Sequence, residues 1–206
     1  EAGVNPAGTR VARESADGRP CVCPTGIAMD GRDARVVIGQ NGEPLTVKHG
    51  FPARIVIPGL YGYVSATKWI TSITLTGLDD FEGYWIPRGW AKDGPVKTQS
   101  RIEVPRSGAT IDVGPVVIAG VAWAQHRGIE RVEVRVDDGS WVEADLGDEV
   151  TVDAWRQWKA TVDMTAGDHT VAVRATDRDG DTQTAKRSSV DPDGATGHHT
   201  IRVEVG

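Results

Sequence analysis

The chain has 206 residues, 39% of them hydrophobic, which is enough for one large domain or two small ones with apolar cores. Its 23 basic and 29 acidic residues give a net charge of −6, which argues against nucleic acid and anionic membranes as main partners. No apolar run approaches the roughly 18 residues of a membrane span, and residues 1–6 lack the basic and apolar regions of a signal peptide. We therefore expect a soluble chain, and its compartment stays open.

Residues 1–34 are rich in glycine, arginine, aspartate and proline, a composition typical of loops or of a poorly ordered tail. One residue separates Cys21 from Cys23, so a disulfide between them would be strained. The pair is too few for a structural zinc site, and the chain has no C-x-x-C or H-x-x-x-H motif. We expect two ordinary thiols.

Two strands are expected in the next part of the chain. Residues 35–38 form the first, and residues 54–57 form the second. The sequence Asn41-Gly42-Glu43-Pro44 lies between them and is typical of a turn. The pattern here is less regular than in the second half.

A polar segment separates the two halves of the chain. Residues 97–106 carry few apolar side chains, and Pro95 and Pro105 mark its ends. We place a domain boundary here, so that residues 1–97 form one domain and residues 98–206 a second.

The second half shows the clearest strand pattern. In residues 129–136 the three valines face one side and the charged residues between them face the other, as in a sheet with one face on a core. Asp137-Asp138-Gly139-Ser140 supplies turn residues, and Trp141-Val142 starts the return strand, which predicts a hairpin. Short strands are also expected at residues 116–123, 158–164, 169–176 and 200–205. This spacing is typical of a β-sandwich.

The stretch NGEPLTVKHGFPARIVIPGLYGYVSATKWI, residues 41–70, resembles the cofactor-binding core of the sulfite oxidase family. That family carries N-G-x-x-L, H-G-F-P-x-R, V-P-G and K-W in this order. The resemblance extends to residues 3–6, 28–34, 84–90, 97–102 and 192–199. It implies a mainly β chain: the C-terminal part of an α+β molybdopterin-binding domain in residues 1–97, then an immunoglobulin-like dimerisation domain in residues 98–206.

The family's cofactor is molybdenum held by the dithiolene of a pterin that carries a phosphate, with one protein cysteine completing the ligation. Its phosphate needs cations and amide donors. The resemblance implies that His49, Arg54 and Lys68 line the pterin and phosphate, and Ser65 and Thr67 can add hydroxyl donors. Taken singly, such residues are more often a turn histidine or a solvated lysine. The family order of the motifs favours cofactor contact.

In sulfite oxidases an arginine from the C-terminal domain reaches the anionic substrate, and residues 123–129 resemble the loop that carries it. The resemblance implies that Arg127 is this residue, and a solvent-exposed loop arginine is the alternative. A tyrosine also lines the substrate site in true sulfite oxidases, where this chain has Trp90. Because Trp90 has no phenolic hydroxyl, this departure argues against sulfite as the substrate. Another small, oxidisable molecule remains as the expected substrate, and it would be an anion if Arg127 binds it.

The family's metal-binding cysteine lies upstream of the Asn-Gly-x-x-Leu segment, in a region that we expect to precede Glu1. Cys21 and Cys23 occupy a different family segment, so no metal ligand is expected among these residues. The chain is therefore interpreted as part of a longer enzyme and is expected to be inactive alone.

Two functions follow from these observations. The resemblance implies a two-electron oxidoreductase with oxygen-atom transfer at molybdenum, and a homodimer. The alternative is a non-catalytic, self-associating immunoglobulin-like interaction module with an incomplete cofactor-binding part. Residues 99–206 hold no recognisable set of nucleophile, base and oxyanion donors, which agrees with an interaction role for that half.

Overall fold

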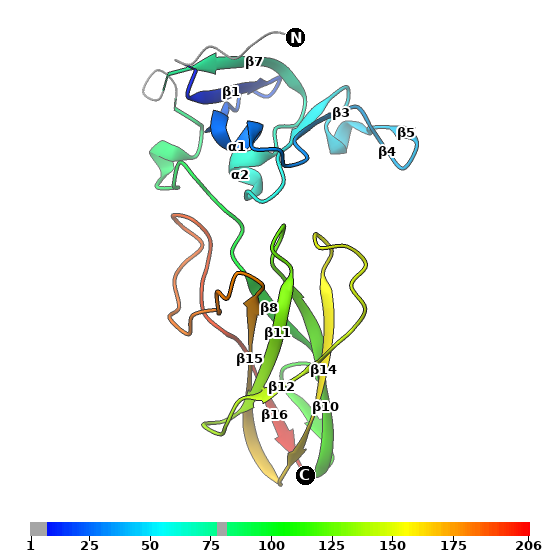
Figure 1. Ribbon diagram of the computed structural model, residues 1–206. Helices are drawn as coiled ribbons and strands as arrows, with labels where there is room; N and C mark the ends of the chain where they lie inside the picture. Colours follow the sequence, from blue (N-terminus) through cyan, green and yellow to red (C-terminus); the bar gives the residue numbers. More distant parts are fainter. Residues whose placement is uncertain (1–7, 78–81) are drawn as a thin grey trace. The chain divides into compact units, whose positions relative to one another are not determined.

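The structure is a computed structural model that describes residues 8–77 and 82–206, and these residues form two compact units (Figure 1). The first unit comprises Glu1–Val96, within its described residues, together with Val190–Gly194. The second comprises Lys97–Ser189 and Ala195–Gly206. Residues 1–7, which include the family-like segment at residues 3–6, lie outside the described part.

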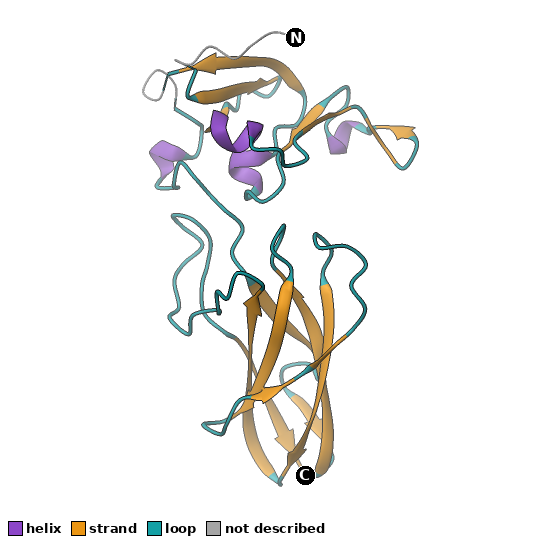
Figure 2. Cartoon of the chain, in the orientation of Figure 1, coloured by secondary structure: helices purple, strands orange, loops and turns teal. Residues whose placement is uncertain are grey.

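The first unit is built on a three-stranded antiparallel sheet with the order β2-β1-β7. Two short antiparallel pairs, β3 with β6 and β4 with β5, and several single-turn helices complete it (Figure 2). The elements are β1 (Arg10–Ser15), β2 (Cys21–Pro24), α1 (Thr25–Met29), β3 (Arg35–Val37), β4 (Gly39–Gln40), β5 (Glu43–Pro44), η1 (Val47–His49), β6 (Arg54–Val56), α2 (Gly62–Ser65), β7 (Ile70–Thr76) and η2 (Ile86–Arg88). The strands predicted at residues 35–38 and 54–57 are confirmed as β3 and β6.

The prediction that residues 1–34 form loops or a tail is wrong for the segment from β1 to α1. The reason is that β1 buries charged side chains: Arg10 is 7% exposed and Arg13 is 0% exposed. The Arg13 guanidinium donates hydrogen bonds to the carbonyl groups of Val64 and Ser65 at the end of α2. A composition rule treats arginine as solvated, so it misses a strand whose arginine satisfies helix carbonyls inside the unit. Cys21 and Cys23 are free thiols, as predicted.

The second unit is a sandwich of two sheets (Figure 1). One sheet has the order β13-β14-β10-β8, and the other has the order β12-β11-β15-β16-β9. The strands are β8 (Gln99–Val104), β9 (Ala109–Ile111), β10 (Gly114–Trp123), β11 (Ile129–Val136), β12 (Val142–Glu143), β13 (Asp145–Leu146), β14 (Arg156–Met164), β15 (Gly167–Asp177) and β16 (His199–Val205). The predicted immunoglobulin-like sandwich is confirmed, as is the predicted hairpin, in which Val134 pairs with Val142.

Alternation of side chains makes the core of the sandwich. In β14, Trp158, Ala160 and Met164 are buried and Val162 packs against the same core, whereas Lys159, Thr161 and Asp163 are exposed. The buried residues of β14 pack with valines of β11 and β15 in one cluster. Gly120 is required where β8 approaches β10, because a Cβ there would lie 1.9 Å from the Arg101 carbonyl oxygen. In residues 8–77 and 82–206 no helix is both long and apolar enough to span a bilayer.

Candidate functional site

Three parts of the segment 41–70 converge in the first unit around Gly50: η1, β6 and residues 67–68. Gly50 ends η1 with φ 106°, and a Cβ added to it would lie 3.1 Å from the Cβ atoms of both Arg54 and Lys68. The Ile55 amide donates to the Thr67 carbonyl at 2.9 Å, which fixes β6 against the residues before β7. Glycine is therefore needed for the close approach that brings Arg54, Thr67 and Lys68 together.

Some polar groups of this cluster, which comprises His49, Arg54, Thr67 and Lys68, have hydrogen-bond partners and others have none. Arg54 Nη1 donates to the His49 carbonyl at 3.3 Å, and Lys68 Nζ donates to the Lys48 carbonyl at 2.9 Å. The His49 ring lies 3.1 Å, by its Nδ1, from the Thr46 hydroxyl. Among the described residues, Arg54 Nε and the Thr67 hydroxyl are buried without a hydrogen-bond partner. An unmatched buried donor costs about 1–3 kcal/mol, so these two atoms suit a ligand that accepts hydrogen bonds.

A pocket of about 250 Å³ adjoins the cluster, and Thr67 and Lys68 belong to both. Arg19 and Lys68 bring positive charge to its wall, and Tyr63, Trp69 and Trp85 bring aromatic rings. Asp17 and Cys21 also line it. The pocket therefore combines cations, hydroxyl donors and flat apolar surfaces, which suits an anionic ligand with a planar ring.

The other predicted residues of the first unit lie close to this pocket. The Ser65 hydroxyl is buried and donates to the Leu60 carbonyl at 3.0 Å, so it ties the end of α2 to the chain that leads into the helix. Trp90 lies against two pocket residues, with ring centroids 4.6 Å from Tyr63 and 5.9 Å from Trp85. Trp90 thus backs the aromatic wall of the pocket.

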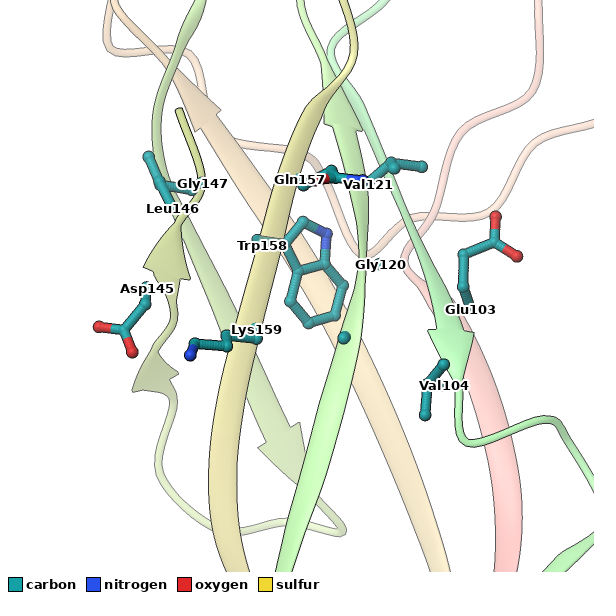
Figure 3. Close-up of a pocket in the computed structure, with 11 residues that line it drawn as sticks. Glu103, Val104, Gly120, Val121, Asp145, Leu146, Gly147, Gln157, Trp158 and Lys159 are labelled. Atoms are coloured by element: carbon teal, nitrogen blue, oxygen red, sulfur yellow. The ribbon is translucent and has the colours of Figure 1, made fainter. Parts of the chain in front are cut away.

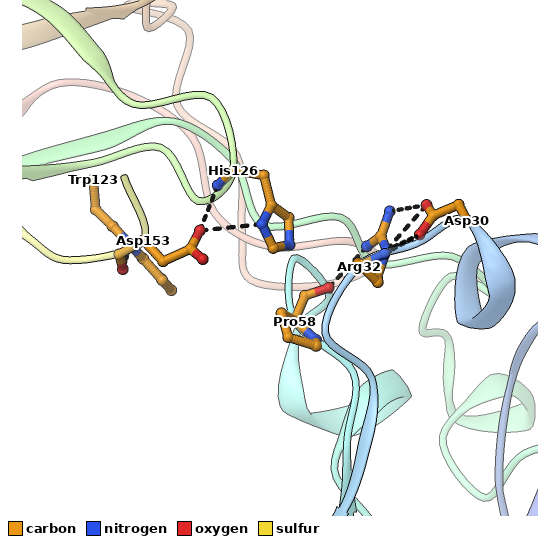
Figure 4. Close-up of polar contacts among 6 residues, drawn as sticks. All are labelled: Asp30, Arg32, Pro58, Trp123, His126 and Asp153. Atoms are coloured by element: carbon orange, nitrogen blue, oxygen red, sulfur yellow. Dashed lines mark hydrogen bonds and ion pairs between the residues drawn. The ribbon is translucent and has the colours of Figure 1, made fainter. Parts of the chain in front are cut away.

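Sequence reasoning missed Arg19, Cys21, Tyr63 and Trp85 as lining residues. The first two lie in the segment that composition assigns to loops, and no motif marks them. Gly94 leaves room for Tyr63, because a Cβ at residue 94 would lie 2.6 Å from the Tyr63 hydroxyl. This close contact is visible only in the structure. Arg32 forms a bidentate ion pair with Asp30, and the Arg32 guanidinium also donates to the Pro58 carbonyl (Figure 4). These contacts hold the neighbouring loop.

Arg127 belongs to the second unit, where it forms an ion pair. Its Nε donates to Asp177 Oδ2 at 2.8 Å, and its Nη2 donates to the Thr98 hydroxyl at 2.9 Å. The Asp177 side chain is 0% exposed, and that of Arg127 is 29% exposed. Burial acts to raise the pKa of Asp177, but hydrogen bonds from Thr98 and Arg127 outweigh it and hold that pKa below its ordinary value.

The loop that carries Arg127 is fixed at a second point. Asp153 Oδ1 accepts hydrogen bonds from the His126 amide at 2.8 Å, and the Trp123 indole donates to the Asp153 carbonyl at 2.8 Å (Figure 4). His126 itself has φ 67°, the left-handed region, so the turn before Arg127 is sharply bent. Hydrogen bonds within the second unit therefore hold both the Arg127 side chain and the loop that carries it.

Residues 1–85 match the oxidoreductase molybdopterin binding domain, and residues 93–191 match the Mo-co oxidoreductase dimerisation domain. The chain therefore carries two domains that are typical of molybdopterin oxidoreductases.

Sulfite oxidases are among the relatives. The mitochondrial sulfite oxidase of Mus musculus is 32% identical over 168 residues, covering 69% of this chain and 30% of that protein. The enzyme of Drosophila melanogaster is 31% identical over 216 residues, covering 86% of this chain and 38% of that protein. The crystal structure of the sulfane dehydrogenase SoxCD from Paracoccus pantotrophus matches 100% of this chain and 59% of its own, at 25% identity and a TM-score of 0.71. The chain belongs to the sulfite oxidase family, as its motifs predicted, and spans about a third of the length of these sulfite oxidases.

Proposed function

We propose that the complete protein is a molybdenum-cofactor-dependent oxidoreductase that acts by two-electron redox and oxygen-atom transfer on a small anionic substrate. The observation that carries the proposal is the pair of unmatched buried donors, Arg54 Nε and the Thr67 hydroxyl, beside Lys68. An anionic cofactor with many acceptor atoms would satisfy both. When bound, the molybdenum cofactor supplies the redox chemistry, and the chain supplies binding, orientation and charge.

Each residue has a distinct part in this proposal. Arg54 offers a planar fork for phosphate, Lys68 a compact charge, and His49 a ring donor. Thr67 donates from its hydroxyl, and Ser65 acts through the helix α2 that it stabilises.

On the substrate side, Arg127 would bind the negative charge of the substrate, and Trp90 would limit its shape. Trp90 has no phenolic hydroxyl, so the proposal names small anions as a class and not sulfite. The direct test is to express the full-length protein, measure molybdenum per chain and assay small oxidisable anions, with sulfite among them. A full-length protein that binds no molybdenum would refute the proposal.

The 206-residue chain purified alone is expected to hold no stoichiometric molybdenum and to oxidise no sulfite. Cys23 is 0% exposed in the core of the first unit, and burial raises the pKa of its thiol, so it is a poor metal ligand. Cys21 lies in a family segment that does not carry the metal-binding cysteine. Elemental analysis of the chain, with the full-length protein as the positive control, tests this expectation. About one molybdenum per chain would contradict it.

The second candidate function is a non-catalytic interaction module. Whether the protein is an oxidoreductase or such a module, one feature of the second unit favours self-association. A hollow of about 390 Å³ opens on the four-stranded sheet, between side chains such as Val121, Leu146 and Trp158 (Figure 3). Val104 and Val117, which are 52% and 50% exposed, extend the apolar surface of the same sheet. We propose that this face forms a homodimer, since isologous contacts of this kind close by two-fold symmetry.

Light scattering of the chain at micromolar concentration is expected to report a dimer. Val117→Glu should shift it toward monomer, because the new carboxylate would be buried in an apolar interface. Val150→Glu is the matched control: Val150 is 82% exposed and lies outside the strands of the sheet, so the dimer should persist. A monomeric parent chain, or equal effects of both changes, would contradict the proposed face.

A further inference from the structure

The family-like segment at residues 192–199 has no part in the site described so far. It lies in the connection between β15 and β16. The Ser188 amide donates to the Thr196 carbonyl at 3.4 Å, and the hydroxyl groups of these two residues lie 2.8 Å apart. These contacts close the base of a loop, residues 188–196, whose tip, Val190–Gly194, packs as part of the first unit. The C-terminal part of the chain therefore supplies a piece of the unit that holds the candidate site.

One carbonyl group of the tip accepts two hydrogen bonds. The Pro192 carbonyl accepts from the Ala91 amide at 2.7 Å and from the Tyr63 hydroxyl at 3.3 Å, and the shorter of these bonds is the stronger. Ala91 directly follows Trp90, and the Tyr63 and Trp90 rings are in contact, with centroids 4.6 Å apart. A carbonyl oxygen has two lone pairs, so this one oxygen holds both sides of the aromatic pair.

The Tyr63 hydroxyl is suited to this contact throughout the neutral pH range. Burial raises the pKa of Tyr63, and the carboxylates of Asp193 and Asp93 act in the same direction. The hydroxyl therefore stays protonated and donates to the Pro192 carbonyl. Asp193 belongs to the tip, so the tip supplies both the acceptor and one of the charges that keep the donor protonated.

Two glycines allow the chain to close on the tyrosines at α2. Gly194 in the tip has φ 99°, and a Cβ added to it would lie 2.6 Å from Cε2 of Tyr61. A Cβ at Gly94 would lie 2.6 Å from the Tyr63 hydroxyl. A side chain at residue 194 would therefore push the tip away from α2, and only glycine permits this approach without strain.

We propose that Pro192 is a positioning residue of the candidate site, and that the loop 188–196 sets the orientation of the Trp90 ring through the Pro192 carbonyl. The ring contacts of Trp90 with Tyr63 and Trp85 are tilted or edge-on, and such contacts are individually weak. The bond at Ala91 instead holds the backbone from which the Trp90 ring projects. The inference rests on the proposed function, in which Trp90 limits the shape of the substrate.

The environment of Trp90 can be measured in the 206-residue chain without cofactor or substrate. The chain is labelled with 5-fluorotryptophan, and Trp90→Phe assigns one of the seven ¹⁹F resonances. Gly194→Ala should shift and broaden the Trp90 resonance, because it displaces the tip and breaks the bond from Ala91. Gly31→Ala is the matched control: Gly31 lies in the same unit with φ 93°, but a Cβ there meets no atom within 4 Å. It adds similar backbone strain without a contact, so the Trp90 resonance should stay in place.

A second variant acts from the base of the loop and leaves the tip unaltered. The Thr196 hydroxyl contacts the Ser188 hydroxyl at 2.8 Å and donates to the Lys186 carbonyl at 2.6 Å. Thr196→Val removes both contacts, so the Trp90 resonance should broaden although the substitution lies outside the tip. Thr182→Val is its control, because Thr182 lies in the same connection and loses a hydroxyl contact of 2.8 Å outside residues 188–196.

Two outcomes would overturn the proposal. One is a Trp90 resonance that keeps its position and width in both Gly194→Ala and Thr196→Val. The other is an equal change in each variant and its control, which would show general strain and not a specific contact. If Gly194→Ala does not fold, Thr196→Val decides, since an exchange of threonine for valine preserves the shape of the side chain.

The full-length protein connects the loop to the proposed function. The probe is the anion that this protein oxidises fastest in the assay of small anions proposed above. Gly194→Ala should raise KM for that anion by about tenfold or more, because a misplacement of about 1 Å can cost about a hundredfold. Pterin content per folded chain should stay at the parent value.

Failure of the inference and failure of the proposed function give different results. An unchanged KM together with a shifted Trp90 resonance would refute the link between the loop and the substrate, and the proposed function would stand. Absence of molybdenum from the full-length protein would refute the proposed function. The resonance of Trp90 in the short chain does not depend on the metal, so it still decides whether the loop orients the ring.

Discussion

Replacing Asp177 with alanine is expected to destabilise the second unit by about 3 kcal/mol. The fully buried carboxylate accepts hydrogen bonds from Thr98, from Arg127 and from the backbone amides of Asp179 and Asp181. Removal of one partner of a buried pair costs about 3–5 kcal/mol, because the remaining charge stays desolvated. We place the loss at the lower end since the Arg127 side chain is 29% exposed and regains some water.

Amide hydrogen exchange of β10 and β14 measures this loss, since it reports the opening free energy of the sandwich separately from that of the first unit. Asp179→Ala is the matched control, because Asp179 lies in the same turn, is exposed, and keeps its backbone hydrogen bond to Asp177 in the variant. That change should stay within about 0.5 kcal/mol of the parent chain. Equal effects of the two substitutions would show that the turn, and not the buried carboxylate, sets the stability.

The same carboxylate predicts a pH dependence with a definite sign. Because folding lowers the pKa of Asp177, its contribution to stability is complete above the unfolded value of about 3.9 and is lost as the pH falls toward the folded value. Asp177→Asn removes that titration. The parent chain should therefore lose stability more steeply than this variant below about pH 4.

The sandwich could be predicted from the sequence because its strands follow simple alternation. In residues 129–136 the buried valines alternate with charged neighbours, and the turn residues after them mark the hairpin. The first unit resists the same reasoning. Arg13 is buried in β1 and satisfies the carbonyl groups of α2, so the strand has the composition of a loop. Its role depends on a partner 51 residues away, which no local pattern contains.

In the candidate site too, some residues could be predicted from the sequence and others could not. The family-like order of motifs pointed to His49, Arg54, Thr67 and Lys68, and the structure gathers these around Gly50. The motifs could not indicate that Arg19 lines the pocket, because Arg19 lies in the turn between β1 and β2, outside the motifs. Nor could they indicate that Asp177 binds Arg127. Both facts depend on contacts between distant parts of the chain, which decide how the motif residues act.

In the full-length protein, Arg54→Ala and Arg127→Ala are expected to fail in different ways. Arg54 has an unmatched buried Nε beside Lys68, so its loss removes a charge-assisted contact worth about 1.5–3 kcal/mol, and cofactor content should fall. Arg127→Ala should leave the cofactor content of the folded protein intact. It should instead raise KM for an anionic substrate, if that contact is equal in the ground and transition states.

Pterin fluorescence per folded chain, with kinetics normalised to molybdenum, separates these outcomes and removes the effect of any loss of folded Arg127→Ala protein. Arg35→Ala is the control for Arg54, because Arg35 lies on the paired strand β3 and forms an exposed ion pair with Asp33. Its cofactor content should match the parent protein, since exposed pairs contribute little. Unchanged pterin content in Arg54→Ala would remove the cofactor assignment. Equal cofactor loss per folded chain in Arg127→Ala would overturn the assignment of Arg127 to the substrate, because a residue that meets only the substrate cannot alter how tightly the cofactor is held.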